Sequence, residues 1–311
     1  FQQRLGDFNK KYFDENGWLY YSKEDYDLLY PSYGDTYPSY NGAIGMTFEQ
    51  GGSGRAGVAF MREDGDTLTL SERIEHHYST SIGTLEAIAS IPKETVEAFK
   101  AYFNDAAKNG AGKYKTFVVK TEGNQSKAQE LANMLQNMKI NVEIATAEKA
   151  KSGFSYQTRK NESFTIEKND LVLSTFQPKG KLVKILFEPE TALEDSNTYD
   201  ITTWALPYAF GMKAFAVTDK VENVTTYAKP TVQNEVPTQT PYAYLVKHQS
   251  FEEIKLIAAL QNQSIKVRVH STPFTLGNQA YEAGTILITK KGNEFLKDFD
   301  KIVVETANSL G

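Results

Sequence analysis

The chain contains no cysteine and only four histidines among its 311 residues. The absence of cysteine excludes disulfide bonds and thiol nucleophiles, and it leaves the redox compartment undetermined. No apolar run approaches the roughly 18 residues that a membrane-spanning helix requires, so we expect no membrane span. The formal net charge of −5 excludes the basic footprint of a nucleic-acid-binding surface. At roughly 100 to 200 residues per domain, the length predicts about two domains.

The most informative segment is the run Gly42-Ala43-Ile44-Gly45-Met46-Thr47-Phe48, which leads into Glu49 and then into glycines. A short apolar run bounded by turn residues predicts a buried strand. Open α/β sheets place their ligands just beyond the carboxyl ends of strands. Glu49 is therefore a candidate reactive carboxylate, although a solvated carboxylate at a strand end fits the same pattern.

Tyr30-Pro31-Ser32-Tyr33-Gly34-Asp35-Thr36-Tyr37-Pro38 and the run that ends at Glu49 resemble the end of the catalytic domain in secreted bacterial zinc carboxypeptidases of the carboxypeptidase A type. The resemblance continues through residues 54–57, 63–70 and 76–81, and covers roughly residues 1–105. It implies that Glu49 is the general base, that Tyr33 or Tyr37 closes over a peptide substrate, and that the protein is secreted or periplasmic. Arg55 is a candidate donor to a substrate carboxylate, with a plain surface charge as the alternative.

The zinc ligands of that family are not found in this sequence. A catalytic zinc ion needs about three protein ligands, and the resemblance places a His-x-x-Glu pair and a distant histidine before Phe1. His76 and His77 are adjacent, so on a helix they cannot form one metal-binding face; we expect one to pack or cap and the other to be solvated. The chain is thus expected to be the C-terminal part of a longer protein, with zinc in the full-length protein and no metal ligand here.

Tyrosines are unusually dense between residues 20 and 40. Such rings pack and hydrogen-bond at once, and they indicate either a wall on the substrate side of the site or an aromatic cluster under a long loop. Residues 52–57 match G-x-G-x-x-G, but no helix is expected directly after them, so we interpret the match as coincidence.

Two helices and a domain boundary follow. The capping box Thr69-Leu70-Ser71-Glu72 predicts the start of a long amphipathic helix whose inward face carries Leu70, Ile74, Tyr78, Ile82 and Leu85. Pro92 predicts the start of a second helix, with Val96, Phe99 and Phe103 facing inward. The glycine-rich break at residues 109–112 then predicts a boundary between domains at residues 1–107 and 108–311.

The second region predicts an α/β domain with an internal duplication. The strand at 116–120, the helix at 128–138 and the strand at 141–145 form a βαβ unit, which is echoed by residues 244–247, 251–261 and 265–269. Right-handed crossovers would place both copies in one mostly parallel sheet. This region resembles a flavodoxin-like or class I glutamine amidotransferase-like accessory domain, but amidotransferase activity needs a cysteine nucleophile and is excluded. We assign it a structural or binding role.

Two hypotheses follow for the function. In the first, the chain is the part of a zinc metallocarboxypeptidase, a peptide-bond hydrolase, that carries the base Glu49 without the zinc ligands. In the second, it belongs to an inactive peptidase relative that binds peptides or envelope polymers through the tyrosine loop and the accessory sheet. The first predicts loss of turnover in Glu49→Gln, and the second predicts ligand binding that is indifferent to Glu49. The preferred C-terminal residue and the oligomeric state do not follow from the sequence.

Overall fold

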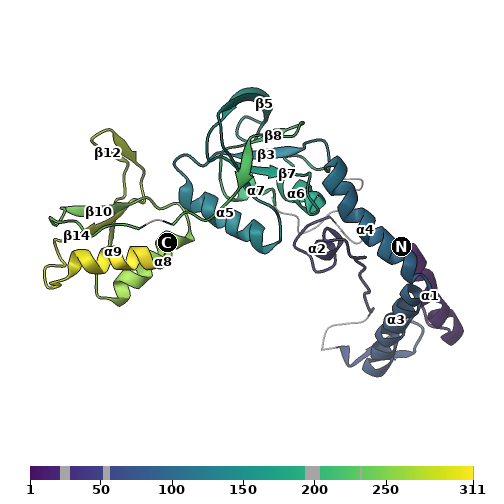
Figure 1. Cartoon of the computed structure of the whole chain (residues 1–311). Coiled ribbons are helices and arrows are strands. Elements are labelled where there is room, and N and C mark those ends of the chain that lie inside the picture. The colour runs from purple at the N-terminus through teal and green to yellow at the C-terminus, as the bar shows by residue number, and fades with distance from the viewer. Residues whose placement is uncertain (22–28, 52–56, 193–203, 232, 311) are drawn as a thin grey trace.

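The computed structural model describes residues 1–21, 29–51, 57–192, 204–231 and 233–310. The fold is mixed α/β, with a helical N-terminal part at one end of the molecule and a small α/β unit at the other (Figure 1). The helices are α1 (Gln2–Asn16), α2 (Thr36–Ser39), α3 (Leu70–Ser90), α4 (Pro92–Asn109), α5 (Gln125–Asn137), α6 (Gly180–Phe187), α7 (Leu206–Ala209), α8 (Phe251–Asn262) and α9 (Phe299–Leu310). The strands are β1 (Ala59–Met61), β2 (Thr67–Thr69), β3 (Thr116–Val119), β4 (Glu143–Ala145), β5 (Lys149–Ser155), β6 (Asn161–Ile166), β7 (Leu171–Ser174), β8 (Ala214–Val217), β9 (Val224–Thr226), β10 (Ala243–Val246), β11 (Arg268–Val269), β12 (Phe274–Leu276), β13 (Gln279–Tyr281) and β14 (Ile286–Thr289).

Helices α3 and α4 start where the sequence predicts, and α4 ends at the predicted glycine-rich break. At the start of α3 the Thr69 peptide N–H donates to Glu72 Oε2 at 2.7 Å, and the Glu72 N–H donates to Thr69 Oγ1 at 3.3 Å. This reciprocal capping box satisfies two peptide donors that the first turn leaves unpaired. Helix α4 has Pro92 in its first turn, and it ends at Gly110 in a backbone conformation with a φ of 65° that favours glycine.

The apolar stripe of α3 faces solvent, which corrects the prediction that it points inward. Ile74, Tyr78 and Leu85 are 60%, 65% and 66% exposed. Helix α3 instead packs against α1 through small side chains on its opposite face. At Gly83 a Cβ atom would come within 2.5 Å of Asn9 Oδ1 on α1, so the close approach of the two helices depends on glycine there.

Residues 43–51 lie outside helices and strands, so the strand predicted before Glu49 is wrong. Gly45 lies so close to the Asp35 carbonyl that a Cβ would meet its oxygen at 2.1 Å. The Gly45 N–H donates to Ser39 Oγ at 3.2 Å, and the Gln2 side chain donates to the Gly45 carbonyl at 2.6 Å. Both peptide groups of Gly45, which a neighbouring strand could have bound, are thus bound by side chains of α1 and α2.

The central sheet has seven strands in the order β6-β5-β8-β3-β7-β4-β9, and every neighbouring pair in it is antiparallel. The prediction of a mostly parallel sheet is therefore wrong. Strands β3 and β4 do run parallel to each other, since both pair antiparallel with β7, which lies between them. The unit is a split βαβ unit in which a later strand separates the two predicted ones.

The predicted duplication exists as two copies of this split unit, which we call the first repeat (residues 116–187) and the second repeat (residues 243–310). In the second repeat, β10 and β11 flank β14 and pair with it antiparallel, as β3 and β4 flank β7. Each repeat places one helix after its first strand, α5 or α8. Each also inserts a hairpin before its central strand, β5–β6 or β12–β13. The identical strand order establishes the repeat independently of side chains.

A side-chain amide occupies the same place in both repeats. After β7, Gln177 Oε1 accepts from the Asn141 N–H at 2.7 Å, and Gln177 Nε2 donates to the Asn141 carbonyl at 3.1 Å and the Ser174 carbonyl at 2.7 Å. After β14, Asn293 makes the same three contacts, to both peptide groups of Lys266 and to the Thr289 carbonyl. Each amide fastens the segment before the outer strand to the end of the central strand.

The two repeats meet through the loops that follow β3 and β10. The Gln249 side chain donates to the Gly123 carbonyl, and Ser126 at the start of α5 hydrogen-bonds the Glu253 carboxylate at the start of α8. Each repeat has its own apolar core, one around Leu131 and Phe187 and the other around Leu260 and Phe299. In the described ranges no helix combines the length and apolar character needed to cross a bilayer.

Candidate functional site

An open hollow of about 550 Å³ lies beside the predicted base. It is lined by residues 34, 35, 38 and 44–48, which come from the turn around α2 and from the segment that precedes Glu49. Glu49 is exposed and directly follows the last lining residue, Phe48. Glu49 is itself not among the described residues that line the hollow, but its side chain is accessible to a solute and follows the lining segment in the chain.

Asp35 is the carboxylate in the lining of this hollow. The Thr47 hydroxyl donates to Asp35 Oδ2, and the Thr36 hydroxyl donates to Oδ1 at 3.2 Å. These bonds, the Thr47 bond above all, hold the pKa of the Asp35 carboxyl below its ordinary value. An ionised Asp35 thus ties the segment before Glu49 to the start of α2.

His76 contacts the chain directly after Glu49. Its Nδ1 lies 2.8 Å from Oε1 of Gln50, the residue after Glu49, and its ring packs against Trp18 with centroids 4.4 Å apart. The side chain is buried, and this burial lowers the pKa of His76. His77 is exposed, so the two histidines divide between packing and solvent as predicted. Glu49 therefore stands between two fixed points, at Thr47 and at Gln50.

The predicted substrate tyrosines pack against other aromatic and apolar side chains. Tyr37 lies against the core of the first repeat. The Tyr33 ring lies edge-on to Tyr30 at 5.1 Å, and Tyr30 lies edge-on to Trp204 at 5.8 Å. Neither Tyr33 nor Tyr37 is among the described residues that line the hollow. These contacts favour the second of the two interpretations of the tyrosine-rich segment, an aromatic cluster under the loop.

Arg55 and the loop tyrosine Tyr26 lie outside the described residues. So does most of the glycine-rich match at 52–57, of which only Gly57 is described. The predicted role of Arg55 in binding a substrate carboxylate stays a prediction.

The donor set of the described chain does not fit a zinc ion. Within the described ranges no three His, Asp or Glu side chains are grouped so that they could hold a metal. His76 and His77 lie on α3, whereas His248 and His270 lie in the second repeat. A catalytic zinc site requires about three such ligands around one point.

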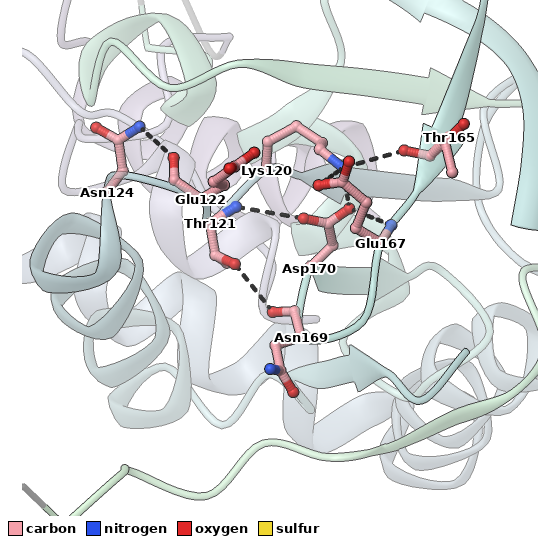
Figure 2. A network of polar contacts seen from close by, with 8 residues as sticks. All are labelled: Lys120, Thr121, Glu122, Asn124, Thr165, Glu167, Asn169 and Asp170. Carbon is pink, nitrogen blue, oxygen red and sulfur yellow. Dashed lines mark hydrogen bonds and ion pairs between the residues drawn. The ribbon is translucent and has the colours of Figure 1, made fainter. Parts of the chain in front are cut away.

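A second polar cluster, at the end of β3, was not predicted (Figure 2). The Lys120 ammonium lies 2.5 Å from Asp170 Oδ2 and 3.0 Å from Glu167 Oε2, and it donates to the Thr165 carbonyl at 3.0 Å. Asp170 also accepts from the peptide N–H groups of Glu167, at 2.7 Å, and Thr121, at 3.3 Å. The side chains of Lys120 and Asp170 are 11% and 1% exposed.

This cluster is a structural fastening of the first repeat. Lys120 binds the carboxylates of both Asp170 and Glu167, and these contacts join the turn before β7 to the end of β3 (Figure 2). Lys120 consequently has little freedom to bind a ligand. The sequence does place Lys120 and Asp170 at the edges of predicted strands, but an ion pair across 50 positions leaves no local pattern.

Asp35 was also missed as a functional residue, although it stands within the stretch that carries the resemblance. Its contact with Thr47 forms because the chain turns back through α2, and a straight strand before Glu49 does not imply such a turn.

Searches of protein-family models, of curated proteins and of solved structures find no match to this chain.

Proposed function

We propose that this chain is the base-bearing part of a secreted or periplasmic zinc metallocarboxypeptidase, in which Glu49 is the general base for peptide-bond hydrolysis. The resemblance of residues 30–52 to that family is the source of this proposal. The zinc ion would be held by residues outside this chain, because the described donor set does not fit one. Only the proton transfer at Glu49 is assigned here.

The observation that carries the proposal is the placement of Glu49. The carboxylate is exposed beside an open hollow, while the chain on either side is held by the Asp35–Thr47 and His76–Gln50 contacts. A general base must be reachable by the proton it removes and held in a productive orientation. The chain is held at Thr47, two residues before Glu49, and at Gln50, directly after it, so the backbone around the proposed base is positioned while its side chain stays accessible.

The exposed apolar surface of the N-terminal part also supports the proposal. Ile74, Tyr78 and Leu85 on α3 lie in solvent, and so does Met61 on β1, at 74% exposure. Large apolar side chains exposed together on one element are typical of a surface on which further protein packs. Under the proposal, the zinc-bearing part of the catalytic domain covers it.

The test is Glu49→Gln in the full-length protein, assayed for release of C-terminal residues from peptides. We expect turnover to fall by at least about a hundredfold, with zinc content by atomic absorption unchanged, because general base catalysis contributes about 10²–10⁴ in rate. Glu63→Gln is the matched control, since Glu63 is an exposed carboxylate in the β1–β2 turn.

Normal turnover in Glu49→Gln would overturn the assignment of the base. Sequencing the native gene upstream of Phe1 is a second check, and we expect a His-x-x-Glu pair followed much later by a single histidine. A different sequence there would leave the peptide-binding hypothesis in its place.

A further inference from the structure

The first strand of the second repeat has an open edge where its counterpart in the first repeat is covered. Strand β3 pairs with β7 on one side and with β8 on the other. Its counterpart β10 pairs with β14 on one side, and in the described part of the chain no strand lies on the other. The second repeat has no counterpart of β8 there. An open sheet edge presents unpaired peptide groups to another chain.

The first repeat shows which peptide groups of β10 are free. The Lys120 N–H donates to the Lys213 carbonyl at 2.9 Å, so Lys120 and, by the alternation of the ladder, Val118 turn their peptide groups toward β8. Their counterparts in β10 are Lys247 and Leu245. Leu245 therefore directs its N–H and carbonyl to the open edge, while Tyr244 and Val246 bond to β14.

The covering strand in the first repeat defines the segment that fits. Strand β8 is antiparallel to β3, is four residues long, and has the apolar sequence Ala-Phe-Ala-Val. Pairing along a four-residue edge buries far less than the roughly 1,200 Å² of a stable protein dimer. Short extended peptides do bind in this way, because main-chain hydrogen bonds supply affinity and alternate side chains supply specificity. The edge therefore fits a peptide better than a second copy of this chain.

The charge at the end of the edge differs between the repeats. Lys120 is bound by Asp170, but the position that corresponds to Asp170 is Thr285 in the second repeat. Lys247 is exposed, and among the described residues its ammonium has the Tyr281 ring, 5.9 Å from the centroid, and no carboxylate at ion-pair distance. In the first repeat Lys213, the residue before β8, lies opposite Lys120. An acidic residue at that position of a bound segment would lie opposite Lys247.

We infer that the open edge of β10 binds an extended segment of another polypeptide, in which an acidic residue precedes about four apolar residues, as an added antiparallel strand. This inference goes beyond the proposed peptidase function and does not depend on it. The strand would hydrogen-bond the peptide groups of Leu245, and its acidic side chain would pair with Lys247.

The test uses the whole 311-residue chain and two fluorescent peptides, Glu-Ala-Phe-Ala-Val-Thr and Lys-Ala-Phe-Ala-Val-Thr, with binding measured by fluorescence anisotropy. We expect the acidic peptide to bind about two- to fivefold tighter than the basic one at low salt, which is the size of an exposed ion pair. Lys247→Gln should remove this preference and leave the basic peptide's affinity nearly unchanged.

Leu245→Pro tests the backbone contact. Proline is tolerated on an edge strand where its missing N–H faces outward, so the variant should fold, as checked by circular dichroism, yet bind both peptides about tenfold more weakly or worse. Leu245→Ala is the matched control, since it keeps the N–H and should retain most of the affinity. Absence of binding by the unmodified chain, binding unaffected by Leu245→Pro and Lys247→Gln, or a dimer that Leu245→Pro dissociates would each overturn the inference.

Discussion

At the scale of single residues, the Lys120–Asp170 pair shows how burial changes the worth of an ion pair. Exposed pairs contribute about 0 to 1 kcal/mol, because water and salt screen them. Asp170 is 1% exposed, and besides Lys120 it binds two peptide N–H groups. Removal of the carboxylate would leave two part-buried peptide donors without a partner, and the Lys120 ammonium would keep only the more exposed Glu167 and the Thr165 carbonyl.

Asp170→Ala is therefore expected to lower the free energy of unfolding by about 1–3 kcal/mol, because two peptide donors lose their acceptor and the ammonium loses the more buried of its two carboxylates. Urea unfolding followed by circular dichroism measures this. Glu167→Gln changes the more exposed partner of the same lysine, 43% exposed, and should cost less than about 1 kcal/mol. Equal costs for the two variants would contradict this account of the cluster.

His76 gives the molecule a predictable response to acid. Burial keeps its folded-state pKa below the ordinary value of about 6.5, so the unfolded chain binds a proton more readily. This contribution to stability is complete above pH 6.5, and it is lost as the pH falls from there through the folded-state pKa. We expect the midpoint temperature of thermal unfolding to decrease when the pH is lowered from about 7.5 to about 5.5. The decrease should be smaller in His76→Phe. His77→Gln should leave it unchanged because His77 is exposed; the same pH dependence in His76→Phe would refute the argument.

At the scale of elements, the sequence correctly predicts where the helices α3 and α4 start, but not which face of α3 is buried. The capping box at Thr69 and the proline at residue 92 act locally, and both helices begin where those signals lie. Which face of α3 is buried depends on what packs there, and α1 packs on the side of Gly83. The periodic stripe through Ile74 is real in the sequence but exposed in the structure.

The strand predicted before Glu49 failed for a related reason. Residues 43–48 have the composition of a buried strand, but the approach of Gly45 to Asp35 and the side chains of Gln2 and Ser39 replace a neighbouring strand. These contacts join segments distant in sequence, and no local pattern encodes them. Glu49 itself could be singled out from the sequence, but its supports, Thr47 with Asp35 and Gln50 with His76, could not.

The equivalent amides of the two repeats allow a paired experiment. Gln177→Ala and Asn293→Ala each remove a side chain that makes three hydrogen bonds to buried or half-buried peptide groups. We expect each to cost about 1–3 kcal/mol, because the peptide groups lose their partners. Hydrogen exchange read by mass spectrometry should show the loss in β4 and β7 for the first variant and in β11 and β14 for the second. Gln157→Ala, which removes contacts outside this fastening, is the control.

At the scale of the whole molecule, the duplication was predicted from sequence but the direction of the sheet was not. Strand, helix and strand recur in order, and the structure repeats them as β3-α5-β4 and β10-α8-β11. The strand that enters between them, β7 or β14, comes later in the chain. Sequence order alone favours adjacent parallel strands, and the intervening hairpins that return the chain antiparallel have no distinct signal. The mixed α/β class could therefore be predicted from the sequence, whereas the antiparallel topology of the sheet could not.

The pairing of β3 with β8 also bears on the order of folding. That pairing joins residue 116 to residue 217, so a long stretch of chain must be ordered before β8 can join the central sheet. The second repeat is complete between residues 243 and 310, and β10, β14 and β11 meet over shorter loops. Contacts between distant residues slow folding, because loop closure costs entropy before any contact forms. The second repeat is thus the part of this chain whose topology allows it to fold sooner, and its Gln249 side chain hydrogen-bonds the Gly123 carbonyl of the first repeat.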